Sequence, residues 1–341
     1  MEKTRKVLAG LAALLVCATL VAEPAKKKSR KRIPAKTSTP AAFDVSAAND
    51  PKTSPPLRRG SSGTPVLRAQ VLLDRARFSP GEIDGIFGTN MTRTVAGFQK
   101  AHGQVGSGMI DEVTWKALNA DRAPVLTRFT IRPEDVAGPF SDVPEDMMEK
   151  ALLPALGYSS PLELLSEKFH ASPKLLAKLN RGRSFDKAGE EILVPSVHTT
   201  LPGEKAAKLV VDKTTSTVTA FDGDGKMIAQ YPATMGSEHD PLPLGDWKVN
   251  GVSRNPPFHY NPDLFWDADA MDEKTTIPPG PNNPVGVVWI DLSKSHYGIH
   301  GTPEPSSIGK TQSHGCIRLT NWDASELAAM VTPGIPAHLQ E

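Results

Sequence analysis

A cysteine and two histidines lie close together near the C-terminal end of the sequence. His300, His314 and Cys316 fall within the segment 297–319, YGIHGTPEPSSIGKTQSHGCIRL, between apolar stretches that are typical of strands. The nucleophilic form of cysteine is the thiolate, and a free thiol with a pKa of about 8.5 holds little of it at neutral pH. A neighbouring imidazole can take the proton and activate the sulfur. These residue types therefore indicate a cysteine nucleophile with a histidine base.

Gly315 stands directly before Cys316. A glycine lets the backbone approach a ligand closely and turn its N–H groups toward it. Such N–H groups form an oxyanion hole, which lowers the barrier by about 3 kcal/mol per donor. One segment thus offers a nucleophile, a base and oxyanion donors, which together are suited to acyl transfer.

Two other interpretations of these residues are available. A lone cysteine in an apolar stretch is commonly a buried small hydrophobe, but two histidines and a glycine beside it favour a reactive thiol. A zinc site could use His296, His300, His314 and Cys316, although their spacing matches no common zinc signature. We therefore expect neither a metal nor a cofactor.

The motif resembles the YkuD-type L,D-transpeptidase catalytic domain, in which a His-Gly pair is followed, after a loop, by Ser/Thr-His-Gly-Cys. Here the pair is His300-Gly301 and the second motif is SHGC at 313–316. The upstream segments PLPLGDWKV, NPPFHYNP and PPGPNNPVG are similar as well. The resemblance runs from about Lys208 to Leu339.

The resemblance implies a role for each residue of the motif. Cys316 would be the nucleophile and His300 the base, oriented by the Gly301 carbonyl. The backbone N–H groups of His314, Gly315 and Cys316 would form the oxyanion hole. From the residues alone His314 competes with His300 as the base, because positions i and i+2 of an extended segment face the same way. We expect His300 to be the base and His314 to contribute position and backbone.

Further side chains near the motif are candidates for substrate binding or for packing. Ser313, Arg318 and Tyr297 are the candidates for contact with the substrate. Arg318 could bind a carboxylate in bidentate fashion, with an internal ion pair as the alternative. Tyr297 could line either the cleft or the core, and Trp266 and Trp289 are expected to be packing residues.

The composition suggests an exported protein with several domains. The chain has 341 residues, of which 39% are hydrophobic, and this length suggests two or three domains. The formal net charge of +1 gives no general attraction to nucleic acid. The two cysteines are Cys17 and Cys316. If Cys17 leaves with a signal peptide, the mature protein holds one unpaired thiol, which is then a candidate reactive group.

Residues 1–22 have the pattern of a secretory signal. Basic residues precede an apolar run from Val7 to Val21, which is shorter than the about twenty residues of a membrane span. We expect export to the cell envelope, either the periplasm or the cell wall, with cleavage after Ala22; an uncleaved segment that tethers the protein to the membrane is the alternative. Residues 23–62 are basic and rich in Pro, and a disordered linker is expected there.

A small helical domain is predicted at residues 63–120. Apolar residues recur at helical spacing from Val66 to Leu73, a turn-rich stretch follows at 79–88, and two more helical segments come after it. The unit resembles the peptidoglycan-binding domain with the pattern IDGxFG, FQ and TW. The matching residues are IDGIFG at 83–88, FQ at 98–99 and TW at 114–115.

A second small domain is predicted at residues 128–197. The stretch FTIRPEDV is typical of a strand, and residues 138–157 are expected to be an insertion. Two short helices then precede a closing strand at 192–195. This order resembles a LysM domain, a β-α-α-β unit that binds glycan. A structural spacer without glycan binding is the alternative.

The last domain, residues 206–341, is predicted to be mostly β. Short strands alternate over 208–236, and the one clear helix is 321–331, capped near Asn321. The chain is therefore expected to be multidomain: a small all-α peptidoglycan-binding domain, a small α+β LysM-like domain and a mostly-β catalytic domain.

Two wall-binding units ahead of an acyl-transfer site suggest peptidoglycan as the partner, through its stem peptides and glycan strands. The resemblance implies an L,D-transpeptidase: Cys316 attacks the amide between the third and fourth stem residues, releases D-Ala and passes the acyl group to an amine of another stem. The product would be a 3→3 cross-link. An L,D-carboxypeptidase, which gives the acyl group to water, is the nearest alternative. A non-catalytic wall-binding protein and a thiol redox protein are alternatives of other classes.

Overall fold

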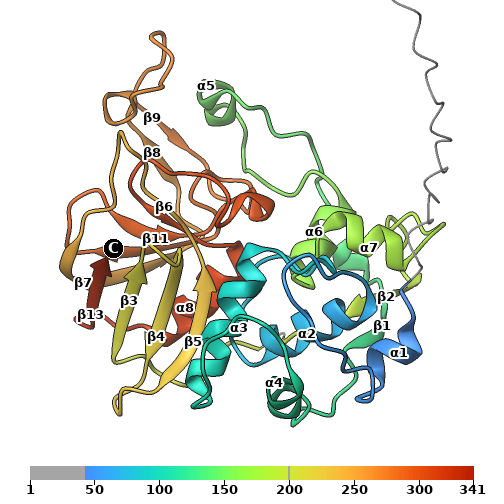
Figure 1. Cartoon of the computed structure of the whole chain (residues 1–341). Helices are drawn as coiled ribbons and strands as arrows, with labels where there is room; N and C mark the ends of the chain where they lie inside the picture. The colour runs from blue at the N-terminus through green and yellow to red at the C-terminus, as the bar shows by residue number, and fades with distance from the viewer. Residues whose placement is uncertain (1–42, 199) are drawn as a thin grey trace, which may run out of the picture. The chain divides into compact units, whose positions relative to one another are not determined.

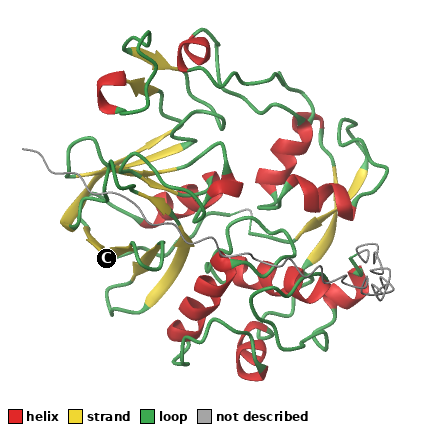
Figure 2. Ribbon diagram, turned by 45° about the horizontal axis from the view of Figure 1, so that its top comes forward, coloured by secondary structure: helices red, strands yellow, loops and turns green. Residues whose placement is uncertain are grey.

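The computed structural model describes residues 43–198 and 200–341 (Figures 1 and 2). The expected signal or anchor at 1–22 and the part of the expected linker at 23–42 lie outside the described residues. No helix in the described part of the chain has the length and apolar character that crossing a membrane requires. Among the same residues, no group of three or more His, Cys, Asp or Glu side chains is placed to hold a metal ion.

The first region is helical, as predicted (Figure 1). Leu67 and Phe98 are almost completely buried between its helices, and each contributes about 1.5–3 kcal/mol through burial. Its last helix begins where the sequence predicts, because Asp111 Oδ1 accepts a hydrogen bond from the Thr114 N–H at 2.8 Å. The helices are α1 (Val45–Asn49), α2 (Thr64–Arg75), α3 (Thr89–Ala101) and α4 (Glu112–Leu118).

The prediction of a disordered linker is wrong for residues 43–62, which pack against the helices. Leu57 exchanges two backbone hydrogen bonds of 2.9 Å with Ile110. The Trp115 indole donates to Pro55 O at 2.7 Å. Composition could not show this packing, because it depends on backbone groups and isolated residues rather than on a periodic apolar pattern.

The second region places two helices against a two-stranded antiparallel sheet. Its core contains Leu165, Leu176 and Ile192, all buried. The predicted order of strand, two helices and strand is present. The elements are β1 (Leu126–Thr130), α6 (Pro161–Lys168), α7 (Pro173–Leu179) and β2 (Glu191–Pro195).

The predicted insertion after β1 reaches into the third region. The stretch FTIRPEDV is only partly a strand, because β1 ends at Thr130 and a 3₁₀ turn, η1 (Pro133–Asp135), follows before the insertion. The insertion itself contains helix α5 (Met147–Ala151). Leu156 is fully buried with Tyr260 and Ile277. Its backbone N–H donates to Pro279 O at 2.9 Å. The insertion therefore packs against the third region as well as belonging to the second.

The third region is built on a nine-stranded sheet of order β5-β4-β3-β13-β7-β10-β11-β12-β6 (Figure 2). Neighbouring strands are antiparallel except for the pairs β3–β13 and β11–β12, which are parallel. A separate hairpin pairs β8 with β9. The strands are β3 (Lys208–Asp212), β4 (Thr217–Phe221), β5 (Met227–Pro232), β6 (Thr234–Met235), β7 (Gly245–Arg254), β8 (Phe258–Tyr260), β9 (Thr275–Ile277), β10 (Val288–Leu292), β11 (Gly298–His300), β12 (Ile317–Arg318) and β13 (Pro336–Gln340).

Helix α8 (Asn321–Met330) packs against this sheet. Leu327 is fully buried in the core that the helix shares with the strands. The N-cap is Thr320, one residue before the predicted Asn321, and its Oγ1 accepts a hydrogen bond from the Asp323 N–H at 3.1 Å. The predicted mostly-β region with one principal helix is confirmed.

Polar side chains of the first region bond directly to α8. Ser79 Oγ donates to Asp323 Oδ2 at 2.9 Å, and Arg77 Nε lies 3.0 Å from Glu326 Oε1. Asp323 is almost completely buried by this contact. The helical region is thus fixed to the sheet region through ionisable groups.

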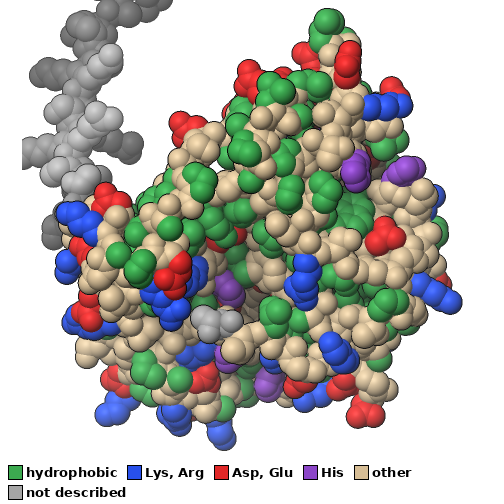
Figure 3. Space-filling view, turned by 180° about the vertical axis from the view of Figure 1, so that it is seen from behind, with side chains coloured by type: hydrophobic (Ala, Val, Ile, Leu, Met, Phe, Trp, Pro, Cys, Tyr) green, Lys and Arg blue, Asp and Glu red, His purple; other side chains and the backbone are tan. Residues whose placement is uncertain are grey.

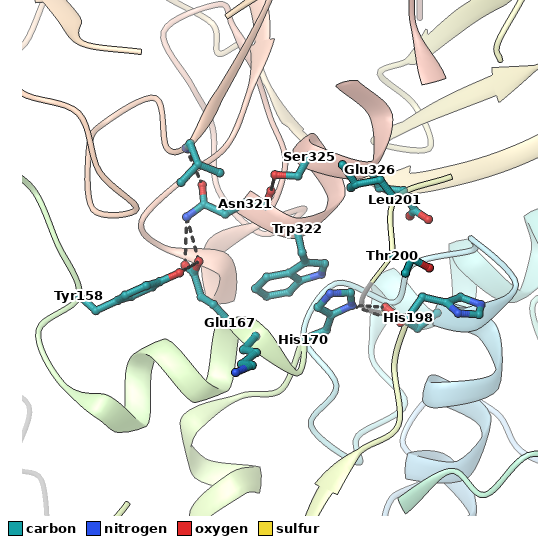
Figure 4. Close-up of a pocket in the computed structure, with 13 residues that line it drawn as sticks. Tyr158, Glu167, His170, His198, Thr200, Leu201, Asn321, Trp322, Ser325 and Glu326 are labelled. Atoms are coloured by element: carbon teal, nitrogen blue, oxygen red, sulfur yellow. Dashed lines mark hydrogen bonds and ion pairs between the residues drawn. The ribbon is translucent and has the colours of Figure 1, made fainter. Parts of the chain in front are cut away.

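His170, at the end of α6, brings the second region to the same junction. Its Nδ1 lies 3.0 Å from Asp74 Oδ1, and its ring stacks on Trp322 with centroids 5.2 Å apart (Figure 4). A cleft of about 380 Å³ opens beside the two rings, lined also by Tyr158 and Glu167. The view from behind shows a hollowed surface with a histidine side chain inside it (Figure 3).

Asp323→Asn is expected to stabilise the protein at alkaline pH. Burial, reinforced by the Asp74 charge, raises the pKa of the Asp323 carboxyl to about 8. Between the ordinary carboxyl pKa and that value, the unfolded state binds fewer protons than the folded state. The contribution of Asp323 to the free energy of unfolding is therefore greatest at low pH. It falls as the pH rises, by up to about 1.4 kcal/mol per pH unit.

Asparagine keeps the size of Asp323 without its titrating charge, so the decline in stability with pH should be shallower in the variant. Urea unfolding at a series of pH values measures this slope. Asp224→Asn, in an exposed turn, is the control. Equal slopes for the wild type and Asp323→Asn would contradict the prediction.

Candidate active site

The predicted base ends one strand of the sheet, and the predicted nucleophile directly precedes the neighbouring strand. Strands β11 and β12 run parallel, with Ile299 opposite Ile317 and His300 opposite Arg318. Cys316 directly precedes β12. Because side chains alternate between the faces of a strand, the fully buried Ile299 and Ile317 point into the core. His300 and Arg318 therefore share the opposite face, and the Arg318 charge acts on the thiol of Cys316, the residue before β12.

His300 is buried and held by two neighbours. Its Nδ1–H donates to Gly301 O at 2.7 Å, which leaves Nε2 as the atom that can accept a proton. Its ring stacks on Trp289, with centroids 5.4 Å apart and 17° between the planes. Burial, together with the Arg318 charge, lowers the pKa of His300 to about 3. The imidazole is therefore neutral at neutral pH.

The Cys316 thiol is half-buried beside the backbone of the segment that leads into β11. Its Sγ lies 3.6 Å from His296 O. Burial raises the pKa of the thiol, and the Gly298 N–H and the Arg318 charge act in the opposite direction. The resting pair is thus a thiol and a neutral imidazole, so proton transfer to His300 must accompany attack by the sulfur.

Arg318→Gln is expected to move the acid limb of the pH–rate profile toward higher pH. A general base works only when neutral, and the Arg318 charge adds to burial in lowering the His300 pKa to about 3. Without that charge the His300 pKa should rise, so activity is lost earlier as the pH falls. The measurement is kcat/KM against pH. An acid limb that stays in place would show that Arg318 does not act on the base.

Gly315 is required by the close approach of Tyr297. The backbone at Gly315 has φ +95°, a region that favours glycine, and a Cβ there would lie 2.6 Å from Tyr297 Cε1. Tyr297 therefore forms a wall of the site rather than part of a remote core. In the part of the chain that the structure describes, the N–H groups of His314 and Gly315 donate no hydrogen bond to another residue.

Ser313 holds the bend before the nucleophile in place, and its predicted contact with substrate stays a prediction. It is almost completely buried. Its Oγ donates to Cys316 O at 2.6 Å and accepts a hydrogen bond from the Gly236 N–H at 2.7 Å. These bonds close the turn that precedes the nucleophile.

His314 faces a different part of the molecule from His300. Its Nε2 lies 2.8 Å from Asp267 Oδ1, and the Phe265 ring packs edge-on against it at 5.1 Å. Residues 314–316 form a bend, so the extended geometry that would place His314 and Cys316 on one side is absent there. Asp267 carries no signal in the sequence, because it is one of several acids in the stretch between β8 and β9.

Trp266 and Trp289 both stack on histidine rings, which the sequence does not predict. The prediction that Trp266 is a packing residue is wrong, because 61% of it is exposed and its ring stacks on His239 with centroids 4.5 Å apart. Trp289 packs, but its partner is His300 itself. Among the described residues Arg318 forms no ion pair, so the predicted internal partner is not found.

Comparison with known proteins identifies the family. Residues 206–338 match the family model of the L,D-transpeptidase catalytic domain, YkuD. The protein named "Putative L,D-transpeptidase YkuD" of Bacillus licheniformis is 31% identical over 175 residues, which cover 51% of this chain and 89% of the relative. Its namesake in Bacillus subtilis is 31% identical over 166 residues, covering 48% and 79%. The chain belongs to the YkuD family of L,D-transpeptidases.

This L,D-transpeptidase acts on peptidoglycan, and it carries a second matched module. Residues 62–118 match a family model described as "Putative peptidoglycan binding domain". The prediction of a helical peptidoglycan-binding domain followed by a mostly-β catalytic domain is confirmed. A solved L,D-transpeptidase from Mycobacterium smegmatis is 23% identical, covering 44% of this chain and 65% of its own, with a TM-score of 0.33.

Proposed function

We propose that Cys316 and His300 carry out the reaction and that the product is a 3→3 cross-link. The observation that supports this best is the pairing of β11, which ends at His300, with β12, which Cys316 directly precedes, together with the fixing of His300 Nδ1 by the Gly301 carbonyl. Cys316 Sγ attacks the carbonyl between the third and fourth residues of a tetrapeptide stem, and His300 Nε2 takes the thiol proton. The C–N bond then breaks, the proton passes to the departing D-Ala amine, and a thioester remains.

The second half of the reaction reverses these steps with a new partner. An amine on the side chain of another stem attacks the thioester carbonyl and gives up a proton to His300. The C–S bond breaks, and the thiol is restored by that proton. Water at about 55 M competes for the thioester, so the acceptor amine must be held in position for transfer to win.

The bend before Cys316 supplies the groups that stabilise the charged oxygen. The N–H groups of His314 and Gly315 are unused by the described protein, and the Cys316 N–H adjoins them. Each donor directed at the oxyanion is worth about 3 kcal/mol. Arg318 lies opposite His300, its charge acts on the Cys316 thiol, and it forms no ion pair within the described part of the chain, so it is suited to binding a stem carboxylate. Tyr297 forms the wall beside Gly315.

Two further parts of the proposal concern the wall and the location. Residues 128–197 are a LysM-like, glycan-binding domain, which is supported by the order β1, α6, α7, β2. The protein is exported to the periplasm or cell wall by residues 1–22, either cleaved or kept as a membrane tether, which is supported by the sequence pattern alone.

Incubation with purified disaccharide-tetrapeptide and mass analysis of the products tests the reaction. A dimer that has lost one D-Ala is the expected product. Tripeptide monomer as the sole product would overturn cross-linking in favour of an L,D-carboxypeptidase. Cys316→Ala, run in parallel, shows whether either product depends on the thiol.

A further inference from the structure

The peptidoglycan-binding domain adds to the edge of the catalytic sheet. Strand β5 is the first strand in the sheet order, and the chain at 77–79 runs beside it (Figure 1). The Ser79 N–H donates to Gln230 O at 2.9 Å, and the Gln230 N–H donates to Arg77 O at 2.9 Å. The open edge of a sheet offers unpaired backbone groups, and these two bonds use them. The two domains are thus joined by main-chain contacts as well as by side chains.

Helix α3 continues this contact toward the active site. It lies against β5, and its first turn meets the loop 301–312, which connects His300 to the Ser313–Cys316 bend. The Asn90 Nδ2 donates to Ile308 O at 2.8 Å. Arg93 Nη1 lies 3.5 Å from Gly309 O. A wall-binding helix therefore bonds to the loop that links the base to the nucleophile.

The fit between helix and loop is close enough to require a glycine. Gly309 has φ +70°, and a Cβ at this position would lie 2.3 Å from Asn90 Oδ1. Ile308 beside it is almost completely buried. The loop at 308–309 therefore has little freedom to move while α3 stays in place.

The catalytic sheet holds the other side of the same loop. Thr234 Oγ1 accepts a hydrogen bond from the Gly309 N–H at 2.9 Å and lies 3.3 Å from Ser307 O. Thr234 belongs to β6, where it pairs with Arg318 of β12, two residues after Cys316. The loop is thus clamped between the sheet that carries the nucleophile and the helix of the wall-binding domain.

We propose that Asn90 is a positioning residue for the transpeptidase reaction, acting through the loop 301–312 on the spacing of His300 and Cys316. The inference rests on the proposed roles of those two residues. A hydrogen bond to a buried carbonyl removes alternative loop conformations, and a small displacement of reacting groups slows the chemical step strongly. The peptidoglycan-binding domain is therefore part of the framework of the active site as well as a tether to the wall.

Asn90→Asp in the full-length protein tests the proposal, because it keeps the size of the side chain and removes the amide donor to Ile308 O. The kcat for dimer formation is expected to fall about tenfold with KM changed less than about twofold, because the chemistry is misaligned while substrate binding is kept. Thr89→Asp places the same charge on the adjacent exposed residue and should behave like the wild type. Wild-type kcat in Asn90→Asp would overturn the proposal.

A double-mutant cycle gives the second test and does not depend on one variant. Gly309→Ala should lower kcat, because its Cβ meets Asn90 Oδ1, and the same substitution should lower kcat less in an Asn90→Ala background. If Gly309→Ala lowered kcat by the same factor in both backgrounds, the two residues would not act together. Full activity of Cys316→Ala would refute the proposed nucleophile, whereas the cycle reports on the coupling of helix and loop whichever residue attacks.

Discussion

Cys316→Ala is expected to lower cross-link formation by about 10⁴-fold or more and to leave no acyl-enzyme, because loss of the nucleophile in covalent catalysis leaves only binding and oxyanion contacts. Cys316 is the one cysteine among the described residues, and it directly precedes the strand that pairs with the strand of His300, whose imidazole can deprotonate it. The measurement is intact-protein mass spectrometry after mixing with tetrapeptide stem. The wild type should gain the mass of the acyl group.

Cys316→Ser is the matched control for this experiment. It keeps the shape of the site and the hydrogen-bonding capacity of the thiol, but a hydroxyl beside a single neutral imidazole is a much weaker nucleophile than a thiol. It should bind substrate with little change and react far more slowly. A wild-type rate in the folded Cys316→Ala protein would refute the assignment of the nucleophile.

The sequence predicts the catalytic motif because the reaction restricts residue types over a short stretch. His300, Gly315 and Cys316 are set apart by chemistry that needs a base, an approachable backbone and a thiol. The parallel pairing of β11 and β12 that brings them together is a tertiary property, and the motif implies it without showing its register. Secondary structure can also be predicted, because it depends on residue types and spacing within short segments. The Asp111 cap and the order of four elements in the second region are examples.

What the sequence could not predict depends on contacts between distant segments. Asp267 contacts His314, but it lies in a stretch with several acidic residues. Nothing in the sequence distinguishes the acid that reaches the imidazole. Asn90 is a helix residue whose partner lies more than two hundred positions away, so no local pattern marks it. The packing of residues 43–62 cannot be predicted for the same reason, since their contacts use backbone groups that any composition can provide.

The pKa shifts change how the site is expected to work. In a resting thiolate–imidazolium pair the sulfur would be charged before substrate binds. Here, however, burial raises the Cys316 pKa and lowers the His300 pKa to about 3. Both shifts favour the neutral forms. The thiol is therefore activated only while it attacks, and the site depends on the position of His300 rather than on a stored charge.

His300→Gln is expected to reduce the acylation rate by about 10³-fold, whereas His314→Gln should reduce it by about fivefold. His300 has its Nδ1 tied to Gly301 O and its Nε2 free to accept a proton, which is the arrangement of a general base. His314 has its Nε2 engaged with Asp267, and its other nitrogen is buried without a hydrogen-bond partner among the described residues. Glutamine approximates the size of imidazole without its basicity, so the comparison separates proton transfer from packing.

The contrast between the two variants decides which histidine is the base. The rate of acyl-enzyme formation is measured at saturating tetrapeptide, with the melting temperature of each variant as the check on folding. If His314 only positions the bend, its loss leaves the peptide N–H groups of 314 and 315 in place, and most of the rate survives. If instead His314→Gln removed acylation and His300→Gln retained it, with both proteins folded, the proton would have to travel through His314 to Asp267. The neutral imidazole of His300 would then serve only to pack against Trp289.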